Sequence, residues 1–174
     1  MGDSFDDEVE RFLARVPGVL AAAGNGHVVR ARAWRRALWE AGLAGFGIPA
    51  EYGGRNEPAD GARRLQRLSK GRVPPEESTF GIGLNMAVPT ILQYGSETLK
   101  KRFVPSALSG EEIWCQLYSE PGAGSDLPGL TTRAVPDGDE WVVNGQKVWN
   151  RSPTSPTGGC SSPAPTPTSR STRA

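Results

Sequence analysis

The sequence predicts an α+β fold in which an N-terminal all-α helical bundle precedes an antiparallel β-domain. Three observations support this prediction. Apolar residues recur at helical spacing in most of the chain up to Ser109. From Ile113 onward, short β-type runs alternate with turn residues. After Asn150 the apolar residues almost disappear, which predicts a disordered C-terminal tail. We therefore expect a helical domain at 1–111, a β-domain at 112–150 and a separate tail at 151–174.

Length and composition exclude several classes of protein. The chain has 174 residues, enough for one ordinary domain or two small ones, and a formal net charge of +1. This charge gives no electrostatic reason to expect nucleic acid or a membrane surface as a partner. Cys115 and Cys160 form neither a disulfide framework nor a metal-ligand spacing. No apolar run is long enough to span a bilayer, and the acidic N-terminus does not resemble a signal peptide, so we expect a cytoplasmic protein.

The first predicted helix covers Ser4–Ala23. Ser4 is suited to cap its N-terminus, with Asp7 at the third helical position, and Gly24 follows its end. Its buried face is predicted from apolar residues at helical spacing, namely Val9, Phe12, Leu13, Val16, Val19 and Leu20.

A second helix is predicted at Val28–Ala41, with a buried face of Trp34, Ala37, Leu38 and Ala41. The basic run on this helix is interpreted as a solvated face; it comprises Arg30, Arg32, Arg35 and Arg36. His27, the single histidine, has no candidate partner nearby and is interpreted as a solvated residue. In the glycine-rich loop that follows, we expect three side chains to contact the core: Phe46, Ile48 and Tyr52.

Three further helical segments are considered. Asp60–Lys70 is predicted as a helix with Ala62, Leu65 and Leu68 as its apolar positions. At Thr79–Tyr94 the residues alone leave strand and helix open, because the apolar positions 80, 82, 84 and 86 alternate. Glu97–Ser109 is predicted as a helix that Ser96 caps and Gly110 ends, with Leu99, Phe103, Val104 and Leu108 facing inward.

Four strands are predicted in the β-domain. The first is Ile113–Tyr118, which enters a glycine-containing loop, and the second is Thr131–Val135. A turn at Asp137–Asp139 leads to the third strand, Glu140–Val143. Asn144–Gly145 is the strongest short hairpin signal in the chain and predicts a fourth strand at Gln146–Trp149.

The loop Ser119–Asp126 is the candidate functional segment. Gly122 and Gly124 lack a Cβ atom, so they can adopt left-handed dihedrals and let a ligand approach the backbone. Successive backbone N–H groups in such a turn form a concave surface suited to phosphate, and two serines add hydroxyl groups. Leu117 and Tyr118 offer apolar surface for a flat ring. The residue types alone also fit an ordinary surface turn.

The order of residues in this region adds a resemblance. Gln116–Leu127 reads QLYSEPGAGSDL, and Asn144–Trp149 reads NGQKVW. The two motifs, at this spacing, resemble the acyl-CoA dehydrogenase family, and the resemblance extends over roughly residues 5 to 150. It places a buried helix at Thr79–Tyr94, with Pro89 as a kink or break. It also implies that the β-domain is the incomplete start of an antiparallel β-barrel domain.

The resemblance implies an oxidoreductase of fatty acid or lipid metabolism, a flavoprotein that uses FAD to remove two hydrogens from the Cα and Cβ of an acyl-CoA thioester. Ser119 would lie beside the flavin ring, Ser125 near the pyrophosphate and the acyl-CoA, and Trp149 against the flavin. The full set of implied cofactor-binding residues is Gln116, Leu117, Tyr118, Ser119, Gly124, Ser125 and Trp149. The family's catalytic base is a glutamate of a C-terminal helical domain, so no residue of this sequence is assigned a catalytic role. A homo- or hetero-oligomer is also implied.

The tail at 151–174 has two interpretations. Ser, Pro, Thr and Gly make up 18 of its 24 residues, as in a flexible linker. The preferred hypothesis is a slip of the reading frame near codon 151, because the shifted frame can be read as a string that resembles the family's next strand. Arg151 also stands where the family has a hydroxyl residue facing the flavin. We therefore expect a truncated chain that is inactive alone. The alternatives are a non-catalytic flavin- or partner-binding subunit, or a helical interaction module with a disordered tail.

Overall fold

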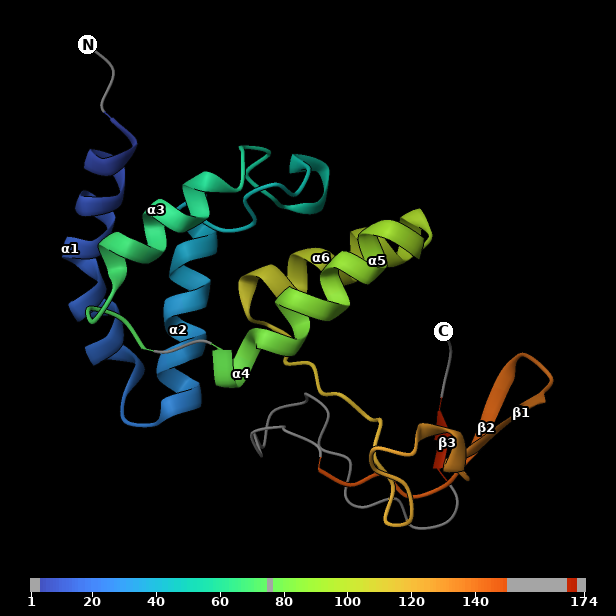
Figure 1. The fold of residues 1–174 in the computed structure, drawn as a ribbon. Helices are drawn as coiled ribbons and strands as arrows, with labels where there is room; N and C mark the ends of the chain where they lie inside the picture. Colours follow the sequence, from blue (N-terminus) through green and yellow to red (C-terminus); the bar gives the residue numbers. More distant parts are fainter. Residues whose placement is uncertain (1–3, 75–76, 150–168, 172–174) are drawn as a thin grey trace. The chain divides into compact units, whose positions relative to one another are not determined.

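The computed structural model describes residues 4–74, 77–149 and 169–171 (Figure 1). The chain divides into two compact units, Met1–Trp114 and Cys115–Ala174. The first is helical and is named the helical unit below. The second holds a glycine-containing loop and an antiparallel sheet, and is named the β-unit.

The N-terminal half of the helical unit consists of α1 (Phe5–Ala23), α2 (His27–Glu40) and α3 (Asp60–Ser69), with α1 packed against both α2 and α3. The predicted cap of α1 is confirmed: the Asp7 N–H donates to Ser4 Oγ (3.3 Å), and the Ser4 N–H donates to the Asp7 carboxylate (3.1 Å). Of the apolar positions named for α3, Leu65 is buried, Leu68 is half-buried and Ala62 is exposed. The shared core comprises Val9, Phe12, Leu13, Val16, Leu20, Trp34, Leu38, Leu43, Ala44 and Leu65.

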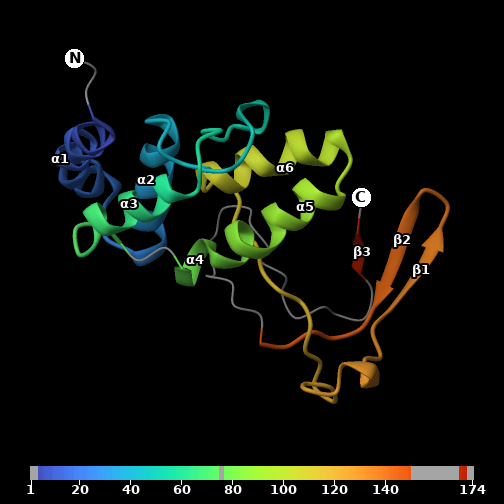
Figure 2. The same ribbon diagram turned by 45° about the horizontal axis from the view of Figure 1, so that its top comes forward.

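The second half of the helical unit is also helical, which settles the strand-or-helix question at Thr79–Tyr94. The chain forms α4 (Glu77–Ile82), a π-helical turn (Gly83–Ala87) and α5 (Val88–Tyr94), and Pro89 lies in the first turn of α5. Phe80, Leu84 and Val88 reach the core four residues apart, which is a helical and not a strand period. The predicted helix at Glu97–Ser109 is confirmed as α6, and Figures 1 and 2 show it beside α5.

Arg35 corrects the interpretation of the basic run on α2 as a solvated face. The Arg35 side chain is buried, and its Nε–H donates to the backbone oxygen of Leu108 at 2.8 Å. Leu108 lies in the last turn of α6, where the carbonyl groups have no partner within the helix. A guanidinium group satisfies such a carbonyl and suits the negative end of the helix dipole. This cation therefore connects α2 to α6.

The loop between α2 and α3 is fastened to the core as predicted, through buried Tyr52 and the half-buried side chains of Phe46 and Ile48. A short 3₁₀ helix, Ala50–Tyr52, lies within it. Arg55 follows, and its guanidinium forms a bidentate pair with Glu8 of α1 (3.0 and 2.9 Å). The same group lies over the rings of Phe5 and Phe46, at 5.5 and 5.6 Å from their centroids.

The sheet of the β-unit has the order β1–β2–β3 with antiparallel neighbours: β1 (Arg133–Asp137), β2 (Glu140–Asn144) and β3 (Ser169–Ser171). β1 and β2 confirm two of the four predicted strands, and the two-residue connection places Gly138 at φ 63°. A 3₁₀ helix, Leu127–Gly129, precedes β1. β3 arises within the stretch predicted to be disordered; 151–168 and 172–174 of that stretch lie outside the described residues.

Two predicted strands are wrong. Ile113–Tyr118 runs without a ladder, because Ile113 is buried among Ala31 and Phe80 of the helical unit instead of pairing with another strand. Gln146–Trp149 is not a strand either, and β3 pairs with β2, with Val143 opposite Ser169. The Asn144–Gly145 signal is overridden because Lys147 and Val148 donate hydrogen bonds to Tyr118 and Ser119 instead of to β2.

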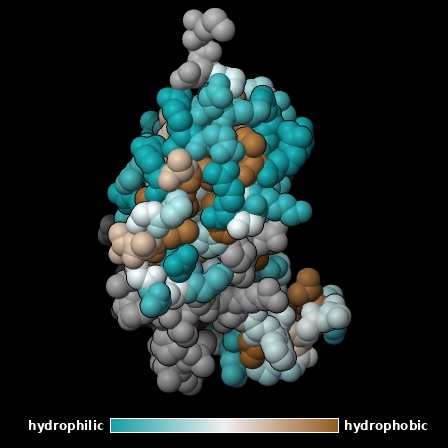
Figure 3. Space-filling view, turned by 90° about the vertical axis from the view of Figure 1, so that its left-hand side faces the viewer, coloured by the Kyte–Doolittle hydropathy of each residue, from teal (hydrophilic) through white to brown (hydrophobic). Residues whose placement is uncertain are grey.

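The surface of the helical unit is mostly polar where α1 lies. In the view of Figure 3, hydrophilic residues predominate on this face and apolar residues form small separate patches. In the part of the chain that the structure describes, no helix has the length and apolar character needed to cross a membrane.

Candidate functional site

The two motifs of the β-unit lie side by side. The Val148 N–H donates to the backbone oxygen of Ser119 at 2.9 Å. The Lys147 ammonium group donates to the backbone oxygen of Tyr118 at 3.0 Å. These bonds join segments that are 29 residues apart in the sequence, and they take the place of the strand predicted at Gln146–Trp149.

Glu120 lies at the centre of this arrangement. One of its carboxylate oxygens accepts the Thr131 N–H (2.7 Å) and the Thr131 hydroxyl (2.8 Å). The other oxygen accepts the Thr132 N–H (2.9 Å) and the Lys147 ammonium group (3.0 Å). The side chain of Glu120 is 4% exposed. The carboxylate is thus almost removed from solvent, and four donors compensate for its burial.

This donor set also sets the charge state of the site. Hydrogen bonds from Thr132 and Thr131, together with that from Lys147, hold the pKa of the Glu120 carboxyl well below its usual range. The four hydrogen bonds therefore stabilise the ionised form of Glu120.

The glycine loop differs in one respect from the sequence-based expectation. Neither Gly122 nor Gly124 has a positive φ, so neither uses the left-handed region that we expected. The turn closes instead through paired backbone bonds between Glu120 and Ala123 (2.8 and 3.1 Å). A Cβ atom on either glycine would meet nothing within 4 Å, so the space beside the backbone is open.

The same loop presents backbone donors to the exterior. Within the described residues, the N–H groups of Gly122, Gly124 and Ser125 donate no hydrogen bond. Ser125 is exposed as well. Successive N–H groups next to open space are the arrangement in which backbone dipoles bind anions.

Apolar side chains flank the joined segments. Leu117 is 44% exposed, Tyr118 is 53% exposed and Trp149 is 90% exposed, whereas Gln116 and Ser119 are half-buried. Trp149 has φ 60°, which is uncommon for a residue with a Cβ atom. Together these exposed side chains place apolar surface next to the joined segments, where it is available to a ligand or a partner.

The structure therefore joins Tyr118 and Ser119 to the segment that ends at Trp149, while Gly124 and Ser125 lie in the turn that follows Glu120. Sequence reasoning did not single out Glu120 or Lys147. Both lie inside the quoted motifs, and their opposite charges were the available signal. Only the fold shows that they pair.

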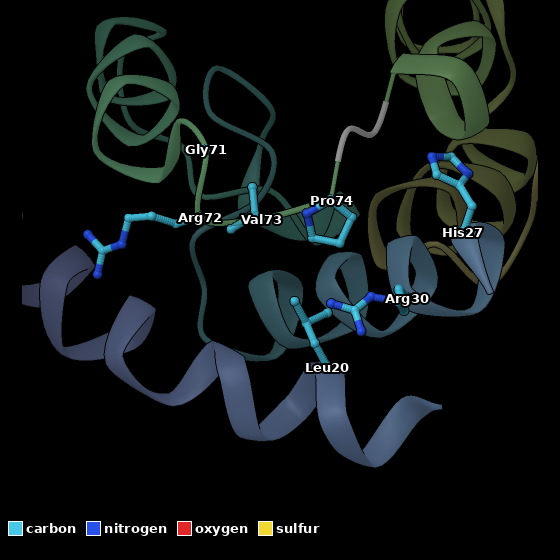
Figure 4. A pocket seen from close by; sticks show the side chains of 7 residues that line it. All are labelled: Leu20, His27, Arg30, Gly71, Arg72, Val73 and Pro74. Atoms are coloured by element: carbon cyan, nitrogen blue, oxygen red, sulfur yellow. The ribbon is translucent and has the colours of Figure 1, made fainter. Parts of the chain in front are cut away.

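A hollow of about 320 Å³ lies on the helical unit and is lined partly by His27, Arg30 and Arg72. Three basic residues suggest an anion site, but Figure 4 shows their side chains pointing in different directions. Arg72 extends toward α1, where it pairs with Glu10 at 2.9 Å. His27 is exposed at the start of α2, consistent with its interpretation as a solvated residue. This hollow is not a convergent binding site.

Comparison with known proteins assigns the chain to a family. The family model "Acyl-CoA dehydrogenase, N-terminal domain" matches residues 3–111. Acyl-CoA dehydrogenase IpdE1 of Mycobacterium tuberculosis is 39% identical over 159 residues, which cover 82% of this chain and 41% of the relative. The chain thus spans about two-fifths of the length of this relative.

Two solved structures share the fold. The Tcur3481-Tcur3483 steroid ACAD is 32% identical, with a TM-score of 0.61, and the match covers 83% of this chain and 39% of that one. The ChsE4-ChsE5 complex from Mycobacterium tuberculosis is 28% identical, with a TM-score of 0.55, over 86% of this chain and 40% of that one. With the family model and the motifs described above, these similarities show that the chain belongs to the acyl-CoA dehydrogenase family.

Proposed function

We propose that this chain supplies a flavin-binding surface for the FAD-dependent α,β-dehydrogenation of an acyl-CoA thioester. The observation that carries the proposal is the joining of the two family motifs through the Val148–Ser119 and Lys147–Tyr118 hydrogen bonds. This joining gathers exposed apolar side chains next to a turn in which the N–H groups of Gly124 and Ser125 donate no hydrogen bond to any described residue. Acyl-CoA dehydrogenases use FAD, which has an apolar ring system and an anionic pyrophosphate, so the two features match the two parts of the cofactor.

The residues of the two motifs have separate proposed roles in binding FAD. Leu117, Tyr118 and Trp149 contact the flavin ring, and Gln116 and Ser119 lie along its polar edge. Gly124 and Ser125 bind the pyrophosphate through backbone N–H groups and the hydroxyl, and Ser125 also contacts the acyl-CoA. Bound FAD would accept the hydride from Cβ. None of the chain's residues is assigned as the acceptor of the Cα proton, so we expect the isolated chain to bind FAD without oxidising acyl-CoA.

Replacement of Trp149 by alanine tests the proposal directly. Aromatic stacking contributes about 0.5–1.5 kcal/mol, so Trp149→Ala should weaken FAD binding about 2- to 12-fold. The matched control is Trp141→Ala, which removes another exposed tryptophan of the same unit, 51% exposed on β2. Titration of the full chain with FAD, followed by flavin fluorescence, measures both dissociation constants.

Two results would contradict the proposal. One is the absence of saturable FAD binding by the unchanged chain. The other is an equal loss of affinity in Trp149→Ala and Trp141→Ala, which would show that the motif tryptophan has no special place at the cofactor.

A second proposal is that the chain assembles with another acyl-CoA dehydrogenase chain. The similar ChsE4-ChsE5 structure is a complex. In the β-unit, the large apolar side chain of Trp141 on β2 is 51% exposed and is available to a partner. Light scattering after size exclusion measures the mass of the assembly. A monomer at all concentrations, with no mass increase on adding candidate partner chains, would reject this second proposal.

A further inference from the structure

We infer that Glu120 is the positioning residue of the proposed flavin site: through Lys147, it sets where Trp149 lies relative to Tyr118 and Ser119. The effect on FAD binding rests on the proposed function. The placement of Trp149 is argued only from contacts within the β-unit. Glu120 gathers donors from two stretches that are separate in the chain, Thr131–Thr132 and Lys147.

The carboxylate has no equivalent substitute at this position. An ionised carboxylate accepts hydrogen bonds at both oxygens, and here each oxygen accepts two. A glutamine of the same shape has one acceptor oxygen, and its amide would point donors at the donors already present. The Glu120 side chain is 4% exposed and that of Lys147 is 17% exposed, so solvent ions screen this pair far less than a surface pair.

Lys147 transmits this anchoring to the second motif. Its ammonium group bonds both Glu120 and the Tyr118 backbone oxygen, each at 3.0 Å. The next residue, Val148, donates its N–H to Ser119. The residue after that is Trp149, whose exposed indole follows a backbone with φ 60°. A positive φ is unfavourable for tryptophan, so we infer that the hydrogen bonds of Lys147 and Val148 keep Trp149 in this backbone conformation.

The first experimental arm needs no cofactor. In the full chain, amide hydrogen exchange followed by NMR reports the Val148 N–H and the Thr131 and Thr132 N–H groups separately. Glu120→Gln should speed exchange at all three amides by about tenfold or more, because each depends on the carboxylate directly or through Lys147. Glu140→Gln, which changes another glutamate of the same unit, should leave them unchanged.

Lys147→Met is a second variant that tests the same role if Glu120→Gln unfolds the β-unit. This variant keeps an unbranched side chain but removes the ammonium group. It should speed exchange at Val148 while Thr131 and Thr132 keep their protection, since Glu120 still accepts their N–H groups. Lys147→Arg should restore protection at Val148. Unchanged exchange at Val148 in Lys147→Met, or equal loss across β1 and β2, would overturn the positioning role.

The second arm measures FAD affinity of the same variants. Lys147→Met and Trp149→Ala should weaken binding by a similar factor, and the double variant should lose little more than either single one. Additive losses would overturn the inference that Lys147 acts through Trp149. If the unchanged chain binds no FAD but Val148 responds as described, the positioning role is supported and the flavin assignment alone fails.

Discussion

Replacement of Gly45 by alanine tests how tightly the α2–α3 loop is held against the helical unit. Gly45 has φ 70°, and a Cβ atom there would lie 2.9 Å from Gly54 Cα and 2.9 Å from Leu108 Cδ1. Gly47 is the matched control, because its φ is 75° but a Cβ atom would meet nothing within 4 Å. Both alanines must adopt a left-handed backbone conformation, but only the Cβ atom at position 45 would contact neighbouring atoms.

The expected magnitudes follow from these two terms. The left-handed conformation costs alanine about 1–2 kcal/mol at either position. Crowding adds about 1–3 kcal/mol at Gly45, because Gly54 is backbone that cannot rotate away and Leu108 is fully buried. The gain from a less flexible unfolded chain is the same for both variants and cancels in the comparison. Gly45→Ala should therefore lower the free energy of unfolding by about 1–3 kcal/mol more than Gly47→Ala.

Urea unfolding of the full chain, followed by circular dichroism at the helical band, measures this difference from the midpoints when the slopes agree. Both variants keep their backbone hydrogen bonds, such as that from the Gly47 N–H to Glu57. Equal midpoints for the two variants would contradict this prediction, since they would show that the loop moves aside at no cost in free energy.

Two further predictions concern the helical unit. The hydrogen bond from Tyr52 to Glu97 (2.8 Å) raises the pKa of the Tyr52 phenol to about 12. Its contribution to stability is therefore complete below the unfolded pKa of about 10 and is lost as the pH rises through 12. Above pH 9 the melting temperature should fall less steeply with pH in Tyr52→Phe than in the unchanged chain, and parallel curves would contradict a role of Tyr52 in this pH dependence. Ser4→Ala removes the hydroxyl that caps α1 and should lower the free energy of unfolding by about 0.5–2 kcal/mol in the urea assay. The loss should be smaller in Ser96→Ala, because the Ser96 hydroxyl accepts one bond of 3.4 Å from the Leu99 N–H and has no reciprocal partner. A larger loss in Ser96→Ala would show that the reciprocal bond between Ser4 and Asp7 adds no stability.

The helices were predictable because their determinants are close together in the sequence. The Ser4 and Asp7 cap and the apolar period fix α1, and the Ser96 cap and Gly110 bound α6. At Thr79–Tyr94 the residues alone left strand and helix open, and a π-helical turn interrupts the α-helical period there. There the helix is stabilised by burial of Phe80 and Val88 in two different clusters, which the local pattern does not reveal.

In the β-unit the local signals were less decisive. The turn around Gly138 predicted the β1–β2 hairpin, since a two-residue connection carries its own geometry. The equally local Asn144–Gly145 signal failed, because Lys147 and Val148 find partners in the loop near Ser119 instead of in β2. The order of residues was enough to locate the candidate loop. It did not reveal that hydrogen bonds to Glu120 hold the loop against Thr131, Thr132 and Lys147.

The helical bundle, the hairpin and the position of the glycine-containing motif could be predicted from the residues alone, because capping, periodicity and turn chemistry act over a few residues. Tertiary structure alone decided that Arg35 is buried against Leu108 and that Glu120 joins Thr131, Thr132 and Lys147. A buried charge is stable only where donors or acceptors converge on it, and those groups come from distant parts of the chain.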